Sequence, residues 1–168
     1  MAARNSAAEA AAERVERKVT ITRVFDAPRS LVFQMWTDPK HVAQWWGPHG
    51  FTNPICEVDA RVGGKLRIVM HGPKGTDYDL DFPMHGVFRD VMPPERLVFT
   101  TVCPGDQEGS VLIEGLTTVT FAEEGGKTRV TVQASATAFG PTGAQMLAGM
   151  DQGWTQSIDK LEAYLANA

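Results

Sequence analysis

The C-terminal segment 141–166 most constrains the fold, because its apolar residues form one helical stripe behind a long series of strand-like segments. The spacing of three or four residues places these side chains on one face of a helix. The stripe consists of Leu147, Met150, Trp154, Ile158, Leu161 and Leu165. Such a face has to be buried, and the preceding strands are its only large apolar partner. We therefore predict a long C-terminal helix packed on a sheet.

Alternating apolar and β-branched residues predict one strand at 18–25 and six more between residues 51 and 136. Between the first strand and the other six, Pro28 and Pro39 open two short helical patterns, at 28–38 and 39–46. The six later strands are expected at 51–60, 65–71, 78–91, 95–102, 111–121 and 127–136. Short turns between them predict an antiparallel meander. The expected order is β-α-α-β6-α, an α+β fold with a curved six- to seven-stranded sheet around the terminal helix.

A chain of 168 residues fits one domain with a short tail. Residues 1–17 are rich in Ala, Glu and Arg and have no apolar stripe before Val15. We expect a helical or disordered extension there and the folded domain at 18–168. The alternative for the extension is an arm that docks on a partner chain, as in a homodimer.

Composition limits the partners. The formal net charge of −4 gives no basic surface for a nucleic acid. Apolar runs are too short for a membrane span, and the N-terminus lacks the apolar core of a secretory signal, so we expect a cytoplasmic protein. Cys56 and Cys103 show no metal-binding spacing and are expected to be free thiols, with a single disulfide as the alternative. We predict no metal and no cofactor.

Four segments, taken in order, resemble the START-like (SRPBCC) superfamily, and more narrowly its branch of homologues of the heat-shock-protein-90 ATPase activator. They read WTDPKHVAQWWGPHGF, EVDARVGGKLRIVMHGPKGTDY, VMPPERLVFT and GWTQSIDKLEAYL, and the resemblance covers about residues 18–166. It implies the helix-grip fold and a hydrophobic ligand cavity between sheet and helix. Members of the superfamily include lipid carriers, hormone receptors and polyketide cyclases. The founding activators carry an additional N-terminal domain that grips the chaperone, for which residues 1–17 offer no counterpart.

The adjacent tryptophans Trp45 and Trp46 cannot share one helix face, so we expect one in the core and the other near the cavity. Met146, Met150 and Trp154 recur at i, i+4 and i+8 and are expected to form the helical wall. Methionine adapts to varied apolar shapes, which suits a binding wall. The full set of residues expected to line the cavity is Trp46, Phe51, Val58, Ile68, Met70, His85, Met146, Met150 and Trp154.

Candidate acid–base groups are few. His71 and His85 fall on adjacent predicted strands and could lie near each other, with Asp59 or Arg67 as partners. The alternating Asp77, Asp79 and Asp81 do not fit a calcium loop and are expected on the wet face of a strand. The sequence contains no nucleophile motif of the GxSxG type. We therefore assign no catalytic residue.

Three functions stay open at this point. The first is a carrier or sensor for a small hydrophobic or aromatic molecule, with a role in stress response as one option. The second is a cavity enzyme of the polyketide cyclase or hydrolase type, which needs positioned acid and base groups. The third is an interaction protein related to the chaperone ATPase activators. The scarcity of catalytic motifs favours binding.

Overall fold

One antiparallel sheet of seven strands forms the body of the molecule, in the order β1-β7-β6-β5-β4-β3-β2. The computed structural model describes residues 14–168. Its elements are β1 (Arg14–Phe25), α2 (Arg29–Thr37), α3 (Pro39–Trp45), β2 (Thr52–Val58), β3 (Lys65–His71), β4 (Asp81–Met92), β5 (Arg96–Pro104), β6 (Val111–Glu124), β7 (Lys127–Phe139), α4 (Gly140–Leu147) and α5 (Met150–Ala166). The predicted β-α-α-β6-α order and the helix-grip fold are confirmed.

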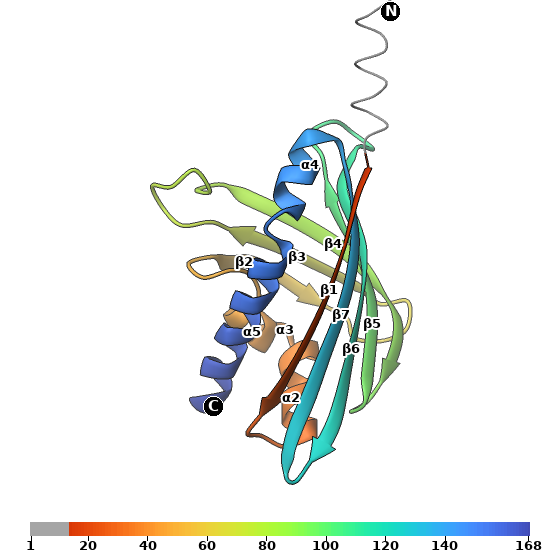
Figure 1. The fold of residues 1–168 in the computed structure, drawn as a ribbon, viewed down its shortest axis with the longest axis vertical. Coiled ribbons are helices and arrows are strands. Elements are labelled where there is room, and N and C mark those ends of the chain that lie inside the picture. Colours follow the sequence, from red (N-terminus) through yellow and green to blue (C-terminus); the bar gives the residue numbers. More distant parts are fainter. Residues whose placement is uncertain (1–13) are drawn as a thin grey trace, which may run out of the picture.

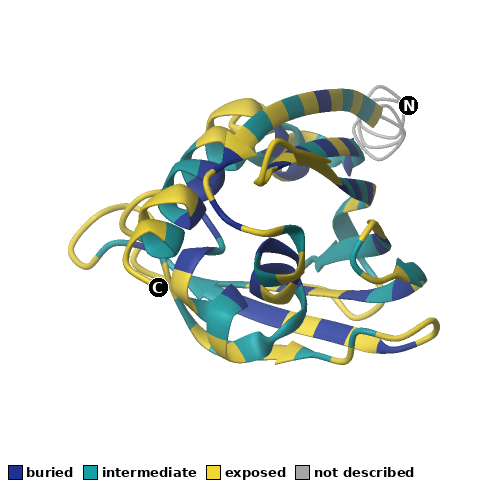
Figure 2. Ribbon diagram, turned by 90° about the horizontal axis from the view of Figure 1, so that it is seen from below, coloured by how far each residue is buried: buried dark blue, intermediate teal, exposed yellow. Residues whose placement is uncertain are grey.

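The sheet curls around the helices, with α5 running across its inner side (Figure 1). Seen from below, buried positions alternate with exposed ones along the strands, as expected when one face is covered and the other is wet (Figure 2). Arg23 of β1 holds α5 through its guanidinium, which lies 2.5 Å from Asp159 and 3.2 Å from Glu162. The edge strand is thereby fixed to the terminal helix.

The first strand begins earlier than the sequence pattern predicts. β1 starts at Arg14, which pairs with Phe139, and its ladder continues to Phe25 opposite Thr128. The four residues before Lys18 therefore extend the sheet, because β7 offers them a long partner strand. The prediction for the rest of the N-terminal extension falls on residues 1–13, which lie outside the described part of the chain.

The two short helices are separated at Asp38, as the Asp-Pro signal predicts. The Asp38 carboxylate accepts a hydrogen bond from the backbone N–H of Lys40 at 2.9 Å and caps α3. Trp45, at the end of α3, is fully buried, and its indole N–H donates to the carbonyl of Met35 at 2.9 Å. This bond ties the end of α3 to α2, so the two helices form one plug at this end of the sheet.

The C-terminal helix is not continuous, which corrects the prediction of one long helix over 141–166. It is broken at Ala148 and Gly149, between α4 and α5. Arg17 donates to the carbonyl of Ala148 at 3.2 Å and lies 3.8 Å from Asp151. A cation at the end of α4 is favoured there because the free carbonyls carry partial negative charge. Because the apolar stripe continues across the break, the sequence pattern does not reveal the break.

The region between β3 and β4 also differs from its prediction. The carboxylates of Asp77, Asp79 and Asp81 were expected along one strand, but β4 begins only at Asp81 and residues 72–80 form the connecting turn. Gly72 lies so close to the carbonyl of Tyr78 that a Cβ on Gly72 would be 1.8 Å from that oxygen. This close approach folds the segment back on itself and removes it from the sheet.

Candidate ligand-binding cavity

An apolar cavity of about 230 Å³ lies between the inner face of the sheet and the helices. Its walls come from the 46–48 segment, from β3 to β7 and from α4 and α5. The lining residues are Trp46, Gly47, Pro48, Met70, Met84, Thr101, Cys103, Ile113, Thr117, Ala134, Ser135, Ala136, Met146, Leu147, Met150, Gly153, Trp154 and Ser157. Four methionines and two tryptophans dominate this set, and such side chains are typical of small-molecule sites.

The cavity exists because side chains on the inner face of the sheet become smaller along β6 and β7. Near the α2–α3 plug, the inner positions hold Val119 and Phe121 on β6 and Val130 and Val132 on β7, all nearly inaccessible to solvent. Farther along, β7 continues with Ala134, Ala136 and Ala138, and β6 with Thr117, Gly115 and Ile113. A line of alanines cannot fill the distance between a curved sheet and a helix, so one end of the fold is packed and the other is hollow.

Five of the nine residues predicted to line the cavity do so. They are Trp46, Met70, Met146, Met150 and Trp154. The structure also separates the two adjacent tryptophans as expected: Trp45 is fully buried in the core, whereas Trp46 is partly exposed and lies in the cavity wall. The contribution of these residues to ligand binding is a prediction.

The other four predicted residues lie elsewhere. His85 is exposed on the outer face of β4, because it alternates with the inward-facing Met84. Val58 and Ile68 point inward but surround a void of only about 20 Å³ beside Phe88, within the packed half of the core. Phe51 packs at 5.8 Å, between ring centroids, against Phe82, outside the cavity.

Sequence reasoning missed the polar part of the wall. Thr101, Cys103, Thr117 and Ser157 contribute hydroxyl or thiol groups to the cavity. The strand periodicity could have assigned the first three to the same inner face as Phe99, but the position along the strand at which the core becomes a cavity depends on the pairing of β5 with β6. Ser157 lies next to the apolar stripe of α5, and its role follows only from where the 46–51 segment runs.

All four tryptophans of the chain form one aromatic cluster beside the cavity. Trp36 packs edge-on against Trp45 at 4.6 Å between centroids and is stacked on Trp154 at 6.3 Å. Trp46 meets Trp154 at 5.6 Å in an edge-to-face arrangement. The cluster joins the α2–α3 plug to α5, so a ligand against Trp46 and Trp154 would change the fluorescence of coupled indoles.

Residues 46–51, of which the first three line the cavity, are held by side chains of α5. The amide of Gly47 donates to Ser157 Oγ at 3.0 Å, and the amide of His49 donates to Gln156 Oε1 at 3.0 Å. Lys160 Nζ lies 3.2–3.4 Å from four carbonyl oxygens of this segment, those of Trp46, Gly47, Pro48 and Phe51. Burial lowers the pKa of Lys160. Through its four carbonyl contacts, the Lys160 side chain clamps the 46–51 segment to α5.

Replacing Lys160 by methionine should destabilise the protein by about 1–3 kcal/mol, because the methylene stem is kept while several carbonyls lose their donor. The free energy of unfolding in urea and the hydrogen exchange of the Gly47 amide measure the effect. Lys40→Met is the matched control, since Lys40 is exposed on α3. Equal stability of the two variants would contradict a clamping role for Lys160.

A model of the family described as Activator of Hsp90 ATPase homolog 1-like protein matches residues 26–166. The chain belongs to this family. The match extends from the end of β1 to the last residue of α5 and so includes every cavity-lining element. The expected place in the START-like superfamily is confirmed by this match together with the fold.

Several solved structures share this fold. An uncharacterised protein from Rhizobium leguminosarum is 24% identical, with a TM-score of 0.75 over 93% of this chain and 98% of that one. A protein from Nitrosomonas europaea is 27% identical, with a TM-score of 0.69 over 89% and 94%. The AHSA1 protein from Silicibacter pomeroyi is 24% identical, with a TM-score of 0.71 over 89% and 98%. No curated protein matches the chain.

Both cysteines of this family member are free, as expected, so the alternative of a single disulfide is wrong. Burial raises the pKa of the Cys103 thiol to about 11 and, with a smaller contribution from the charge of Glu57, that of Cys56 to about 11. Cys103 therefore meets the cavity as a neutral thiol at physiological pH and has no thiolate to offer as a nucleophile. Among helices of residues 14–168, none is long and apolar enough to cross a membrane.

The histidines of this family member do not form the expected pair. His71 packs with the turn that follows β3: its Nδ1 lies 2.7 Å from Asp81 Oδ1 and its Nε2 lies 2.8 Å from Asp79 Oδ1. His85 pairs with Arg67 across the β3–β4 ladder, four positions from the His71–Asp81 pair. Hydrogen bonds to Asp81 and Asp79 raise the pKa of His71. This cluster is on the surface and organises the 72–80 turn.

We expect His71 to titrate above the range of a free histidine and the Asp79→Asn substitution to bring it down. The stabilisation from the charged imidazole is fully present below about pH 6.5, the unfolded value, and is lost as pH rises through the raised pKa. The imidazole NMR signals of His71 measure the titration. Asp77→Asn, in the same turn, is the control, and a shift of equal size in both variants would contradict the assignment.

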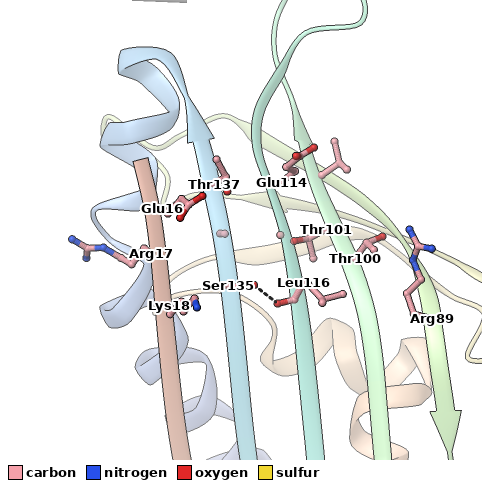
Figure 3. Close-up of a pocket in the computed structure, with 13 residues that line it drawn as sticks. Glu16, Arg17, Lys18, Arg89, Thr100, Thr101, Glu114, Leu116, Ser135 and Thr137 are labelled. Atoms are coloured by element: carbon pink, nitrogen blue, oxygen red, sulfur yellow. Dashed lines mark hydrogen bonds between the residues drawn. The ribbon is translucent and has the colours of Figure 1, made fainter. Parts of the chain in front are cut away.

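A second, larger hollow of about 500 Å³ lies on the face of the sheet away from α5. Figure 3 shows its side chains spread over β1, β7, β6, β5 and β4. Its lining carries both charges, with Glu16 and Lys18 on β1, Glu114 on β6 and Arg89 on β4, and hydroxyl groups lie among them. No helix covers this surface, and charged and hydroxyl side chains line it, so it lacks the apolar wall that a small hydrophobic molecule needs.

Proposed function

We propose that this protein binds a small hydrophobic molecule in the cavity between the sheet and α5 and acts as a carrier or sensor. The observation that carries the proposal is the cavity itself: an apolar pocket of about 230 Å³ lined by Trp46, Trp154 and four methionines, in a fold whose other half is packed. The pocket is open to solvent, so its apolar wall exposes surface that a bound hydrophobic ligand would bury. A ligand best explains why the protein keeps this wall apolar.

The alternative of a cyclase or hydrolase requires an acid or base in the cavity. Among the described residues that line it, the only titratable side chain is Cys103, whose raised pKa keeps it neutral. The sequence candidates His71, His85 and Arg67 are exposed or partly exposed on the outer face. These observations favour binding over acid–base catalysis.

The proposal is tested by titrating the full chain with a panel of one- and two-ring aromatic compounds and short lipids while following tryptophan fluorescence and Tm. A ligand at one hundred times its Kd adds about 2.7 kcal/mol of stability. That corresponds to a rise in Tm of roughly 5–10 °C for a chain of this size. If no compound changes either the fluorescence or Tm, the binding proposal is wrong.

A further inference from the structure

The wall chemistry of the cavity restricts the ligand further than its apolar character does. Of the described residues lining it, none carries an Asp, Glu, Lys, Arg or His side chain. A carboxylate or ammonium entering this space would lose its hydration without meeting an opposite charge, which is very costly in an apolar environment. The cavity therefore selects against ions.

Size gives the second restriction. A dry apolar cavity of about 150 Å³ holds a benzene molecule. The cavity of this protein, about 230 Å³, is larger than that by the space of a substituent or a second fused ring. The indole rings of Trp46 and Trp154 line the cavity and supply aromatic surface for such a guest.

Polar groups give the third restriction. Thr117 is 3% exposed and Ser157 is 6% exposed, and both line the cavity together with Thr101. Within residues 14–168, neither Thr101 nor Thr117 has a side-chain hydrogen bond, and Ser157 Oγ accepts from Gly47 without donating. Among residues 14–168, the hydroxyl oxygens of Thr101 and Thr117 are not among the buried side-chain atoms that lack a hydrogen-bond partner, so both are accessible from the cavity. An accessible hydroxyl on an apolar wall can donate a hydrogen bond to a polar group of a guest.

The two threonines lie on neighbouring strands at the same inner face. Thr101 of β5 pairs with Gly115 of β6, and Thr117 follows two residues later on β6. Diagonal neighbours of this kind are about 7–8 Å apart. A Cβ on Gly115 would be 3.0 Å from Thr101 Oγ1, so the glycine leaves this hydroxyl open. Both hydroxyls are on the central strands of the sheet and are rigidly placed.

We propose that the cavity takes an uncharged one- or two-ring aromatic compound whose carbonyl or hydroxyl oxygen accepts a hydrogen bond from the threonine pair Thr101 and Thr117. This inference rests on the proposed binding function and names the class of its ligand. The ring packs between Trp46, Trp154 and the methionines, and the oxygen faces the sheet.

Three probes of nearly the same shape separate the effect of the ligand's charge from that of its hydrogen-bonding oxygen: acetophenone, α-methylstyrene and benzoate. α-Methylstyrene replaces the carbonyl oxygen of acetophenone with CH₂, and benzoate replaces the methyl group with a charged oxygen. At pH 7.5 we expect acetophenone to bind at least 100-fold more tightly than benzoate, because only the ion has to be desolvated. Binding of benzoate within ten-fold of acetophenone would overturn the proposal.

The double substitution of Thr101 and Thr117 by valine tests the proposed hydrogen bond from the threonine pair, which we call the anchor. It keeps the shape of both side chains and should weaken acetophenone about five-fold while leaving α-methylstyrene unchanged or tighter. The control is Thr118→Val with Thr120→Val, two outward positions on β6 opposite Gln133 and Thr131. An equal effect of the inner pair on both neutral probes overturns the anchor. Failure of both neutral probes to bind any variant or the parent chain instead counts against the binding function itself.

Discussion

Ala136→Leu should weaken binding of a small aromatic ligand about 50-fold and leave the protein folded. Ala136 lies on the inner face of β7 in the cavity wall, and leucine adds three carbon atoms there. Each methylene that a ligand can no longer bury costs about 0.8 kcal/mol, which for three groups is roughly 2.4 kcal/mol. Because the leucine fills part of the cavity, the free energy of unfolding should stay the same or rise by up to about 1 kcal/mol. Fluorescence titration and urea unfolding measure the two effects.

Gln133→Leu is the matched control for Ala136→Leu. Gln133 lies on the same strand but faces outward and is exposed, so the same side chain is added without entering the cavity. We expect unchanged affinity. If both leucine variants bind ligand as the parent chain does, the ligand site is not this cavity.

Trp45→Ala should lower the free energy of unfolding by about 4 kcal/mol and Tm by roughly 8–16 °C, whereas Trp46→Ala should cost half of that or less. Trp45 is fully buried, donates to the Met35 carbonyl and packs on Trp36, so its removal leaves a void in the core and an unpaired carbonyl. Trp46 is partly exposed in the cavity wall. Differential scanning calorimetry compares the two variants.

For ligand affinity, the order of the two variants should be the opposite of their order for stability. Trp46→Ala removes a wall of the cavity and should weaken aromatic ligands more than ten-fold, while Trp45→Ala, measured well below its Tm, should retain binding. The two variants delete the same side chain, so they serve as controls for each other. Equal losses of stability together with equal affinities would contradict the division between core and cavity.

The element order and sheet topology could be predicted from sequence because each depends on local patterns: strand alternation, Pro at helix starts and the stripe from Leu147 to Leu165. The start of β1 at Arg14 could not, since residues 14–17 become a strand only through pairing with β7. The break at Ala148 was also hidden. A helical stripe continues through a kink when both halves face the same side.

The cavity residues divide in the same way. Met146, Met150 and Trp154 were predictable from helical spacing alone, and Trp46 from its position directly after Trp45. On strands, one residue of register decides between inside and outside, and for that reason the prediction of His85 as a cavity residue is wrong. Val58 and Ile68 lie on the predicted inner face but in the packed half of the core. The change from large to small inner side chains occurs on β6 and β7. The alternation of residues on β2 and β3 gives no information about where that change occurs.

The methionine methyl groups test the central claim most directly. Met70, Met84, Met146 and Met150 line the cavity, whereas Met35 is buried in the packed core and Met92 is exposed at the end of β4. In a titration of ¹³C-methyl-methionine-labelled protein with acetophenone, the account predicts saturable shifts of the four cavity signals and none at Met35 or Met92. Shifts confined to Met92, or the absence of any shift at the four cavity methionines up to the solubility limit, would contradict it.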